Sequence, residues 1–261
     1  MESIILAAGY SSRFNFEEES YQKYLLPFEK SNILNYVIVG MIEARIQKIN
    51  IIVDDKVSQK QITDSCKSFI EKLKIEPPIL NFIINTYSER ENGYSLFLGI
   101  KEISSEFFIL SMADHIFTDN VYLHLINNDD NKDIVLATDP MKIKGIYDLD
   151  DCTKVFGSNS EIKRIGKNLS DYNRLDMGVF KMKTKSIQNI SQDIEQQMNK
   201  FGVSNIVVSA INSNLNVAYL DFPNTLWLDV DNHHEYNKLN QIFNNSKKFH
   251  PFDLDIISEK F

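Results

Sequence analysis

Short isoleucine-rich apolar runs alternate with stretches of helical period through the first half of the chain, and this alternation restricts the fold more than any other feature. Brief apolar runs bounded by turn residues are typical of buried strands, and the longer stretches carry apolar residues at the spacing of one helix face. Strands separated by helices indicate βαβ units with right-handed crossovers around a parallel sheet. The pattern predicts strands at 3–6, 49–53, 80–84 and 107–112, and helices at 32–45, 59–72 and 94–103.

The pattern becomes mixed after Asp114. We therefore expect an α/β fold with a Rossmann-like, mixed but mostly parallel central sheet flanked by helices, and later strands that extend the sheet and build a smaller lobe over it. Residues 1–245 are interpreted as a single domain, followed by a tail at 246–261 with weak periodicity. The later elements are expected as strands at 133–138, 174–181, 216–220 and 226–230, and as helices at 186–200 and 233–244.

The acidic balance of the chain limits the classes of partner. Lysine and arginine number 28 against 36 acidic residues, for a net charge of −8, which argues against a nucleic-acid-binding protein. The N-terminus has Glu2 and no basic stretch before its apolar run, so no signal peptide is expected. The longest uncharged stretch, 201–220, is rich in asparagine and serine, which hydrocarbon penalises. We expect a cytoplasmic protein with no membrane insertion, and Cys66 and Cys152 as isolated free thiols.

A loop rich in small residues follows the first predicted strand. Its Leu-Ala-Ala-Gly segment at 6–9 lies at the carboxyl edge of the predicted sheet, where backbone N–H groups can face an anion. The Walker spacing is absent, and a single glycine does not make a dinucleotide fingerprint. Two cations, Arg13 and Lys23, follow the loop. Taken alone, the segment fits an anion-binding loop or a tight turn with two surface cations.

Carboxylates collect at two predicted strand ends. Asp114 follows the strand at 107–112, while Asp229 and Asp231 end another apolar run and share one face, because strand periodicity is two. A lone carboxylate there is often a helix cap, but acids from two strand ends suit Mg²⁺, which binds through one or two carboxylates plus substrate phosphates. The adjacent histidines show no zinc spacing and are interpreted as neighbours rather than ligands: His115, His233 and His234.

Two further segments carry polar residues in turns. The Asn-Gly pair at 92–93 is a turn signal before a helical run whose first turn holds Ser95. Lys167 follows a glycine in a turn, and Asp-Met-Gly at 176–178 opens a strand. Taken alone, the first segment is an ordinary helix start and the second is a hairpin with a surface lysine.

Together and in this order, the four segments resemble the nucleotidyltransferases that activate sugar phosphates and polar-alcohol phosphates, whose fold is that of the nucleotide-diphospho-sugar transferases. The Asn-Gly-Tyr-Ser-Leu string at 92–96 is similar to that of the inositol-1-phosphate cytidylyltransferases in that family. The chain departs from the family pattern by an acidic insertion at 15–21, between Arg13 and Lys23, and by Gln22 where the family has a proline before the lysine.

The resemblance implies a role for each segment. It implies that Arg13, Lys23 and Asp114 are catalytic, that Asp114, Asp229 and Asp231 hold Mg²⁺, and that the smaller lobe binds the acceptor. For the acceptor it implies Lys154, Lys167, Asp176 and Gly178. For the nucleotide it implies Leu6, Ala7, Ala8, Gly9, Ser11, Ser12, Asn92, Gly93 and Ser95.

The implied activity is that of a CTP-dependent cytidylyltransferase, which forms a CDP-alcohol, here expected to be CDP-inositol from inositol 1-phosphate, and releases pyrophosphate. No catalytic base is needed, because a phosphomonoester is already mostly dianionic at neutral pH. Other acceptors stay open, namely a sugar 1-phosphate, phosphocholine or a phosphonate. The alternative of another class is a catalytically inactive regulatory module.

The resemblance also bears on partners. The expected ligands are CTP and a small phosphorylated alcohol, with no nucleic acid. In the resembled family the domain is often fused to a membrane transferase that makes an inositol phospholipid, so a separate membrane CDP-alcohol transferase could act as the partner of this chain.

Overall fold

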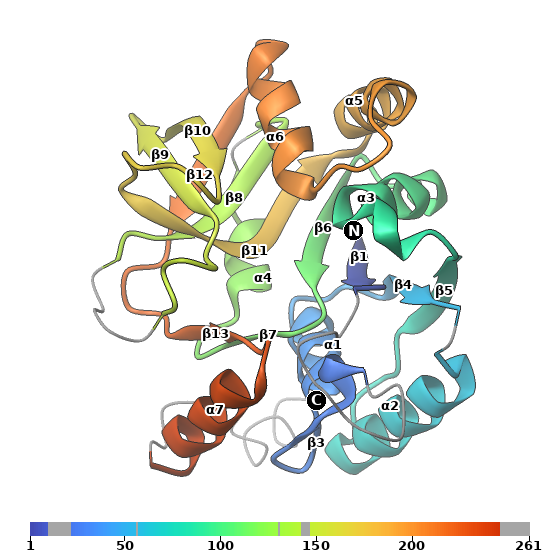
Figure 1. Ribbon diagram of the computed structural model, residues 1–261. Helices are drawn as coiled ribbons and strands as arrows, with labels where there is room; N and C mark the ends of the chain where they lie inside the picture. The colour runs from blue at the N-terminus through green and yellow to red at the C-terminus, as the bar shows by residue number, and fades with distance from the viewer. Residues whose placement is uncertain (10–21, 56, 130, 142–146, 246–261) are drawn as a thin grey trace.

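The computed structural model describes residues 1–9, 22–55, 57–129, 131–141 and 147–245. Within these residues the central layer is a nine-stranded sheet in the order β5-β4-β1-β6-β11-β8-β12-β10-β9 (Figure 1). Its strands are β1 (Glu2–Ala7), β4 (Lys48–Asp54), β5 (Ile79–Asn85), β6 (Phe107–Met112), β8 (Ile134–Asp139), β9 (Lys154–Ser158), β10 (Glu161–Gly166), β11 (Arg174–Lys183) and β12 (Val217–Asp221).

The two halves of the sheet pair differently. β5, β4, β1 and β6 are parallel neighbours, as the alternation of strands and helices predicted. β11 is antiparallel to both β6 and β8, β12 is parallel to β8, and β10 pairs antiparallel with β12 and β9. The predicted α/β class, a mixed sheet flanked by helices, is confirmed.

Helices cover both faces of the sheet, and the alternating side chains of β1 contact both layers. Ile5 and Ala7 pack toward α1, α2 and α4, whereas Ile4 and Leu6 pack toward α3, α5 and α6. A strand buried on both faces must be apolar throughout, which accounts for its continuous hydrophobic run. The helices are α1 (Ile33–Glu43), α2 (Gln59–Leu73), α3 (Asn92–Gly99), α4 (Val121–Ile126), α5 (Thr184–Gln197), α6 (Val203–Asn212) and α7 (His233–Asn245), with short 3-10 turns η1 (Lys23–Leu25), η2 (Ser88–Arg90) and η3 (Ile100–Glu102).

The strand predicted at 226–230 forms outside the central sheet, whereas the strands predicted at 133–138, 174–181 and 216–220 extend that sheet. β13 (Trp227–Asp229) pairs antiparallel with β7 (His115–Phe117) in a separate two-stranded sheet, with Asp229 opposite His115. A third cluster of buried apolar residues joins this pair to α1, α2 and α7, and to the β2 (Pro27–Phe28) and β3 (Ser31–Asn32) hairpin. The tertiary pairing carries the end of β13 back beside the end of β6.

Helix α6 was not predicted. Its Val203, Ile206, Val207 and Ala210 are buried and contact the layer that contains α3 and α5. Their spacing of i, i+3, i+4 and i+7 is the signal that identifies an amphipathic helix. The β-branched residues favour a strand locally, and burial of this apolar face outweighs that preference.

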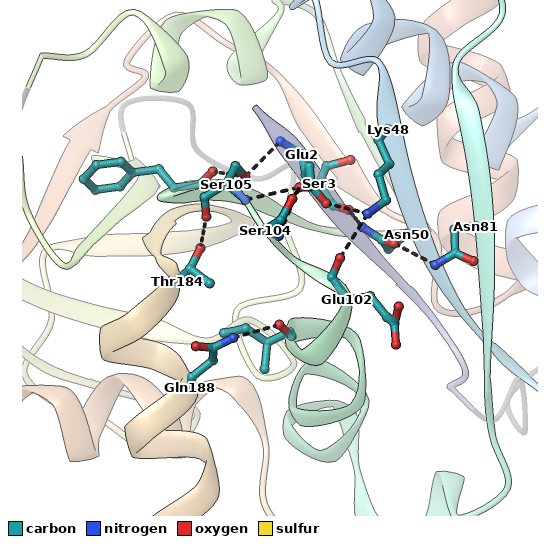
Figure 2. A network of polar contacts seen from close by, with 12 residues as sticks. Glu2, Ser3, Lys48, Asn50, Asn81, Glu102, Ser104, Ser105, Thr184 and Gln188 are labelled. Atoms are coloured by element: carbon teal, nitrogen blue, oxygen red, sulfur yellow. Dashed lines mark hydrogen bonds and ion pairs between the residues drawn. The ribbon is translucent and has the colours of Figure 1, made fainter.

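A polar network lies at the amino end of β1, and Figure 2 shows its residues. The Glu2 carboxylate accepts hydrogen bonds from the backbone N–H of Ser104 at 3.0 Å and from Lys48 Nζ at 2.9 Å. Burial would raise the pKa of Glu2, but the hydrogen bonds from Ser104 and Lys48 lower it to about 2. The Lys48 ammonium also donates to the Glu102 carbonyl at 3.0 Å. This network ties β1, β4 and the segment before β6 together at the edge opposite the strand ends that follow.

Two further observations concern the described residues. None of their helices combines the length and the apolar character that crossing a bilayer requires. Cys66 and Cys152 are both buried free thiols, and burial raises the pKa of each to about 12.

Candidate active site

A cavity of about 580 Å³ opens at the carboxyl ends of β1 and β6. Open α/β sheets place their ligands at this edge. The cavity brings together residues from all four segments singled out in the sequence. Those that line it are Leu6, Ala7, Ala8, Gly9, Lys23, Asn92, Ser95, Asp114, Lys167, Asp176, Gly178, Asp229 and Asp231.

Two of the described candidate residues do not line the cavity. Gly93 and Lys154 stand directly behind the lining, each through contacts given below. The expectations for Ser11, Ser12 and Arg13 lie outside the described residues.

An ammonium group and two carboxylates occupy the floor of the cavity. Lys23 Nζ lies 2.5 Å from Asp114 Oδ2 and also pairs with Asp231 Oδ1. Burial alone would lower the pKa of Lys23, but Coulomb attraction to Asp114 and Asp231 raises it above its usual value. Burial likewise would raise the pKa of Asp114, and the attraction of Lys23 and His115 holds it well below its usual range. Lys23 and Asp114 are therefore both charged near neutral pH.

His115 supports this floor from below. Its Nδ1 lies 2.7 Å from Asp114 Oδ1, and its ring stacks on Trp227 with centroids 5.8 Å apart and planes 14° from parallel. Burial would lower the pKa of His115, but the Asp114 carboxylate raises it, so the ring donates its Nδ1–H to Asp114. Gly178 lies against the same ring: a Cβ there would stand 2.8 Å from the imidazole, and its φ of 72° disfavours any other residue.

The carboxylates of Asp114, Asp229 and Asp231 fit a hard divalent cation by the chemistry of their oxygen donors. Burial raises the pKa of Asp229 against the opposing effect of His115, and the carboxylates of Asp231 and Asp114 add to the rise. Such crowded oxygen donors are stabilised by a cation, and Mg²⁺ takes one or two carboxylates together with substrate phosphates. In the part of the chain that the structure describes, no three acidic, histidine or cysteine side chains converge as a preformed metal cluster. Lys23 instead provides the positive charge between Asp114 and Asp231.

One wall of the cavity consists of residues 88–95 and 198–204, which we call the α3–α6 wall. Asn92 Oδ1 accepts the N–H of Val203 at 2.9 Å, and the Phe201 carbonyl accepts the N–H of Gly93 at 3.0 Å. A Cβ on Gly93 would lie 2.5 Å from the Phe201 carbonyl oxygen, so only glycine allows this approach. Ser95 Oγ accepts from Asn85 Nδ2 at 2.9 Å. The close approach explains the Asn-Gly pair better than an ordinary turn does.

The sequence analysis missed several residues of this wall. Ser88, Glu91, Gly202, Val203 and Ser204 all line the cavity. The last three lie at the start of the unpredicted α6, and the helical spacing noted above is the signal that could have located them. Their approach to the Asn-Gly pair depends on long-range packing that no local pattern indicates.

Lys167 and the half-buried Asp176 also line the cavity, and Lys154 lies behind Lys167. Lys167 Nζ pairs with Asp151 Oδ1 at 2.7 Å and keeps 56% of its side chain exposed. The Lys154 side chain is buried, and its Nζ donates to the Lys167 carbonyl at 2.8 Å. Asp176 Oδ1 accepts the N–H of Gly178 at 2.7 Å, and burial raises the pKa of Asp176 to about 6. Lys167 thus faces the cavity while Lys154 braces the turn that carries it.

Comparisons with known proteins identify a family and several relatives. The family model described as "MobA-like NTP transferase domain" matches residues 3–146. The chain is 27% identical over 237 residues to the "Bifunctional IPC transferase and DIPP synthase" of Aquifex aeolicus, which covers 90% of the chain and 50% of that protein. It is 23% identical to the "CTP:phosphoglutamine cytidylyltransferase" of Campylobacter jejuni over 73% of the chain and 76% of that protein. The chain spans about half the length of the bifunctional relatives it matches.

Solved structures share the fold. The inositol-1-phosphate CTP transferase from T. maritima superposes with a TM-score of 0.78 at 22% identity, covering 95% of this chain and 96% of that one. A UDP-glucose pyrophosphorylase in complex with UDP-glucose superposes with a TM-score of 0.76 at 16% identity, over 94% of this chain and 99% of that one. At these sequence identities the structural similarity establishes the shared fold alone.

Proposed function

The chain belongs to the MobA-like NTP transferase domain family, and from this premise we propose that it transfers the cytidylyl group of CTP to inositol 1-phosphate, forming CDP-inositol and pyrophosphate. The observation that carries the proposal is the convergence on one cavity of the loop after β1, the α3–α6 wall, the Lys23–Asp114–Asp231 floor and Lys167. The choice of CTP and inositol phosphate is supported by the names of the relatives from Aquifex aeolicus and T. maritima.

The reaction needs charge neutralisation and alignment rather than a catalytic base. A phosphate oxygen of the acceptor attacks the α-phosphorus of CTP, the bond to the β-phosphate oxygen breaks, and pyrophosphate leaves with that electron pair. The acceptor phosphate requires no deprotonation near neutral pH. In our proposal Lys23 neutralises the triphosphate, Lys167 holds the acceptor phosphate, and the loop at 6–9 orients the α-phosphate through its N–H groups. When bound by Asp114 together with Asp229 or Asp231, Mg²⁺ would supply further neutralisation of the phosphate oxygens.

The acceptor end supports a polyol phosphate. Asp176 lies within the lining and offers a carboxylate to hydroxyl groups, while the exposed ammonium of Lys167 is within the same cavity. A second candidate keeps CTP and changes the acceptor to another small phosphorylated compound, since the Campylobacter jejuni relative, of which the chain covers 76%, is named for phosphoglutamine.

Nucleotide preference is the first test. With MgCl2 and inositol 1-phosphate, we expect kcat/KM for CTP to exceed that for UTP by about tenfold to a hundredfold, because a site that accepts the cytosine amino group leaves a buried acceptor unpaired when uracil binds. Pyrophosphate release measures the rate, and mass spectrometry identifies the CDP-alcohol. Equal kcat/KM for CTP and UTP would contradict the proposal. A parallel panel with phosphoglutamine, phosphocholine and glucose 1-phosphate tests the acceptor, and a higher kcat/KM for any of these would replace inositol 1-phosphate.

Substitutions of Lys167 and Lys154 should differ in their effect on the KM for inositol 1-phosphate. Lys167→Ala should raise the KM for inositol 1-phosphate about tenfold to a hundredfold, because a charge-assisted contact contributes roughly 1.5–3 kcal/mol, while CTP affinity measured by calorimetry stays unchanged. Lys167→Arg should recover little, since a planar fork does not reproduce a compact ammonium. Loss of CTP binding with an unchanged acceptor KM would place Lys167 on the nucleotide side.

Lys154 provides the comparison for that test. Its ammonium donates to the Lys167 carbonyl, so we expect Lys154→Met to lower stability and to weaken the acceptor less than Lys167→Ala does. A larger acceptor defect in Lys154→Met than in Lys167→Ala would make Lys154 the direct phosphate ligand.

A further inference from the structure

Arg90 joins the two segments of the α3–α6 wall. Its guanidinium donates from Nε to the Asn199 carbonyl at 2.8 Å and from Nη1 to Glu195 Oε1 at 3.1 Å. A third donor, Nη2, lies 3.4 Å from the Met198 carbonyl. These acceptors gather at the C-terminal end of α5, where a cation also meets the negative end of the helix dipole. The planar guanidinium is therefore matched to a fixed set of acceptors, one on α5 and two in the segment 198–204 that follows it.

The ring contact and the backbone carbonyl of Arg90 also connect it to the segment around Phe201. The guanidinium carbon lies 3.9 Å from the centroid of the Tyr94 ring, and Tyr94 in turn meets Phe201 edge to face with centroids 6.5 Å apart. The Arg90 carbonyl accepts the N–H of Phe201 at 3.2 Å. Backbone and side chain of Arg90 thus both contact 198–201, and only 15% of the side chain is exposed.

The residue that follows Arg90 is held in an unfavourable backbone conformation. Glu91 has φ 70° and ψ 178°, a region that essentially only glycine populates. Such a conformation persists where contacts of the neighbouring residues hold the backbone in place. Here those contacts are the anchored Arg90 on one side and the Gly93–Phe201 hydrogen bond on the other. Glu91 lines the cavity, so the strained backbone lies at the ligand surface.

We propose that Arg90 is a positioning residue for the nucleotide: it does not line the cavity, but it holds Glu91 and Asn92 against Gly202 and Val203 in the geometry that CTP requires. The inference rests on the proposed function, in which CTP binds along this wall. Misplacement of a binding surface by a remote substitution is enough to reduce function about a hundredfold. The effect should fall on CTP and spare the acceptor, because Lys167, which follows β10, and Asp176, on β11, belong to other elements than the wall.

The experiment measures CTP affinity by isothermal titration calorimetry with MgCl2 and without acceptor, so that no turnover occurs. Arg90→Ala should raise the Kd for CTP about tenfold to a hundredfold. In steady-state assays its KM for CTP should rise in parallel, while the KM for inositol 1-phosphate changes by less than about twofold. Arg90→Lys keeps the charge beside Glu195 without the fork, so its Kd should lie between those of the wild type and Arg90→Ala. It also provides the measurement if the alanine variant does not fold.

Arg174 offers a matched control. Its guanidinium donates to Asp221 at 2.8 and 3.1 Å and stacks 3.7 Å from the Tyr219 centroid. The side chains of Arg174 and Asp221 are 14% and 30% exposed, against 15% and 30% for Arg90 and Glu195. Arg174→Ala should therefore destabilise the protein comparably, as thermal melting reports, and leave the Kd for CTP unchanged.

The outcomes separate the two proposals. Failure of the wild type to bind CTP overturns the proposed function and this inference with it. CTP binding by the wild type together with equally tight binding by Arg90→Ala overturns the inference alone. An equal loss of CTP affinity in Arg90→Ala and Arg174→Ala also overturns it, because the effect would then follow from stability and not from the wall.

Discussion

Replacing Asp114 with asparagine should reduce kcat/KM for cytidylyl transfer by at least about a hundredfold, the loss that follows removal of one preorganised electrostatic contact. Asparagine keeps the shape and retains an oxygen that can accept from Lys23 or His115, so the fold should persist. The substitution removes a charge from the floor and a proposed Mg²⁺ ligand. Pyrophosphate release at saturating MgCl2 measures the effect, and EDTA should abolish the activity of the wild type.

Asp133 provides the control for this substitution. Its carboxylate accepts from Ser186 Oγ at 2.6 Å and from the N–H of Asn216 at 3.0 Å, and it does not line the cavity. Asp133→Asn should retain wild-type kcat/KM. Near-wild-type turnover of Asp114→Asn in MgCl2, or full activity of the wild type in EDTA, would remove Asp114 and the metal from the proposed mechanism.

Substitution of Lys23 by methionine should have a second large effect, on stability as well as on turnover. Methionine fills similar space but leaves the carboxylates of Asp114 and Asp231 without the ammonium that joins them. Breaking a buried ion pair by removing one partner typically costs about 3–5 kcal/mol. Loss of the proposed triphosphate contact should separately lower kcat/KM, relative to the wild type, by about a hundredfold to a thousandfold. Chemical denaturation and pyrophosphate release measure the two effects separately.

The Glu2 network of Figure 2 offers a control substitution for that experiment, one that changes stability without touching the cavity. Lys48 pairs with Glu2 at 2.9 Å on the edge of the sheet opposite the cavity. Lys48→Met should lower the free energy of unfolding less than Lys23→Met does, because 34% of the Lys48 side chain is exposed. It should leave kcat/KM unchanged. Full activity of Lys23→Met at a temperature where it remains folded would exclude Lys23 from the reaction.

The sequence alone was sufficient for the parts of the site that lie at strand ends. Parallel strands carry their carboxyl ends to one edge, so the sequence placed the loop at 6–9 and Asp114 at the same edge of the sheet. The pairing of β1 with β6 in the structure makes them neighbours there. The same reasoning placed Asp229 and Asp231 after an apolar run but could not state which edge they reach. The pairing of β13 with β7 puts Asp229 opposite His115. That pairing joins segments more than a hundred residues apart, and no local periodicity encodes it.

The contacts of Lys23 likewise could not be predicted in full from the local sequence. The sequence placed a lysine near an anion-binding loop and implied contact with a triphosphate. The structure adds that its ammonium lies between two carboxylates from different strand ends. Burial strengthens this pairing, because the Coulomb attraction between an ammonium and two carboxylates is larger where all three are poorly solvated.

Sequence periodicity determined the βαβ order of the first half, because strand and helix spacing are local properties of neighbouring residues that each chain segment carries by itself. Only the tertiary structure decided that α6 packs against α3 and α5, that Gly93 meets Phe201, and that Arg90 braces the cavity wall. These outcomes depend on which surfaces are buried against one another. The free energy of burying an apolar face or of satisfying a guanidinium is a property of two segments in contact, and neither segment carries it alone.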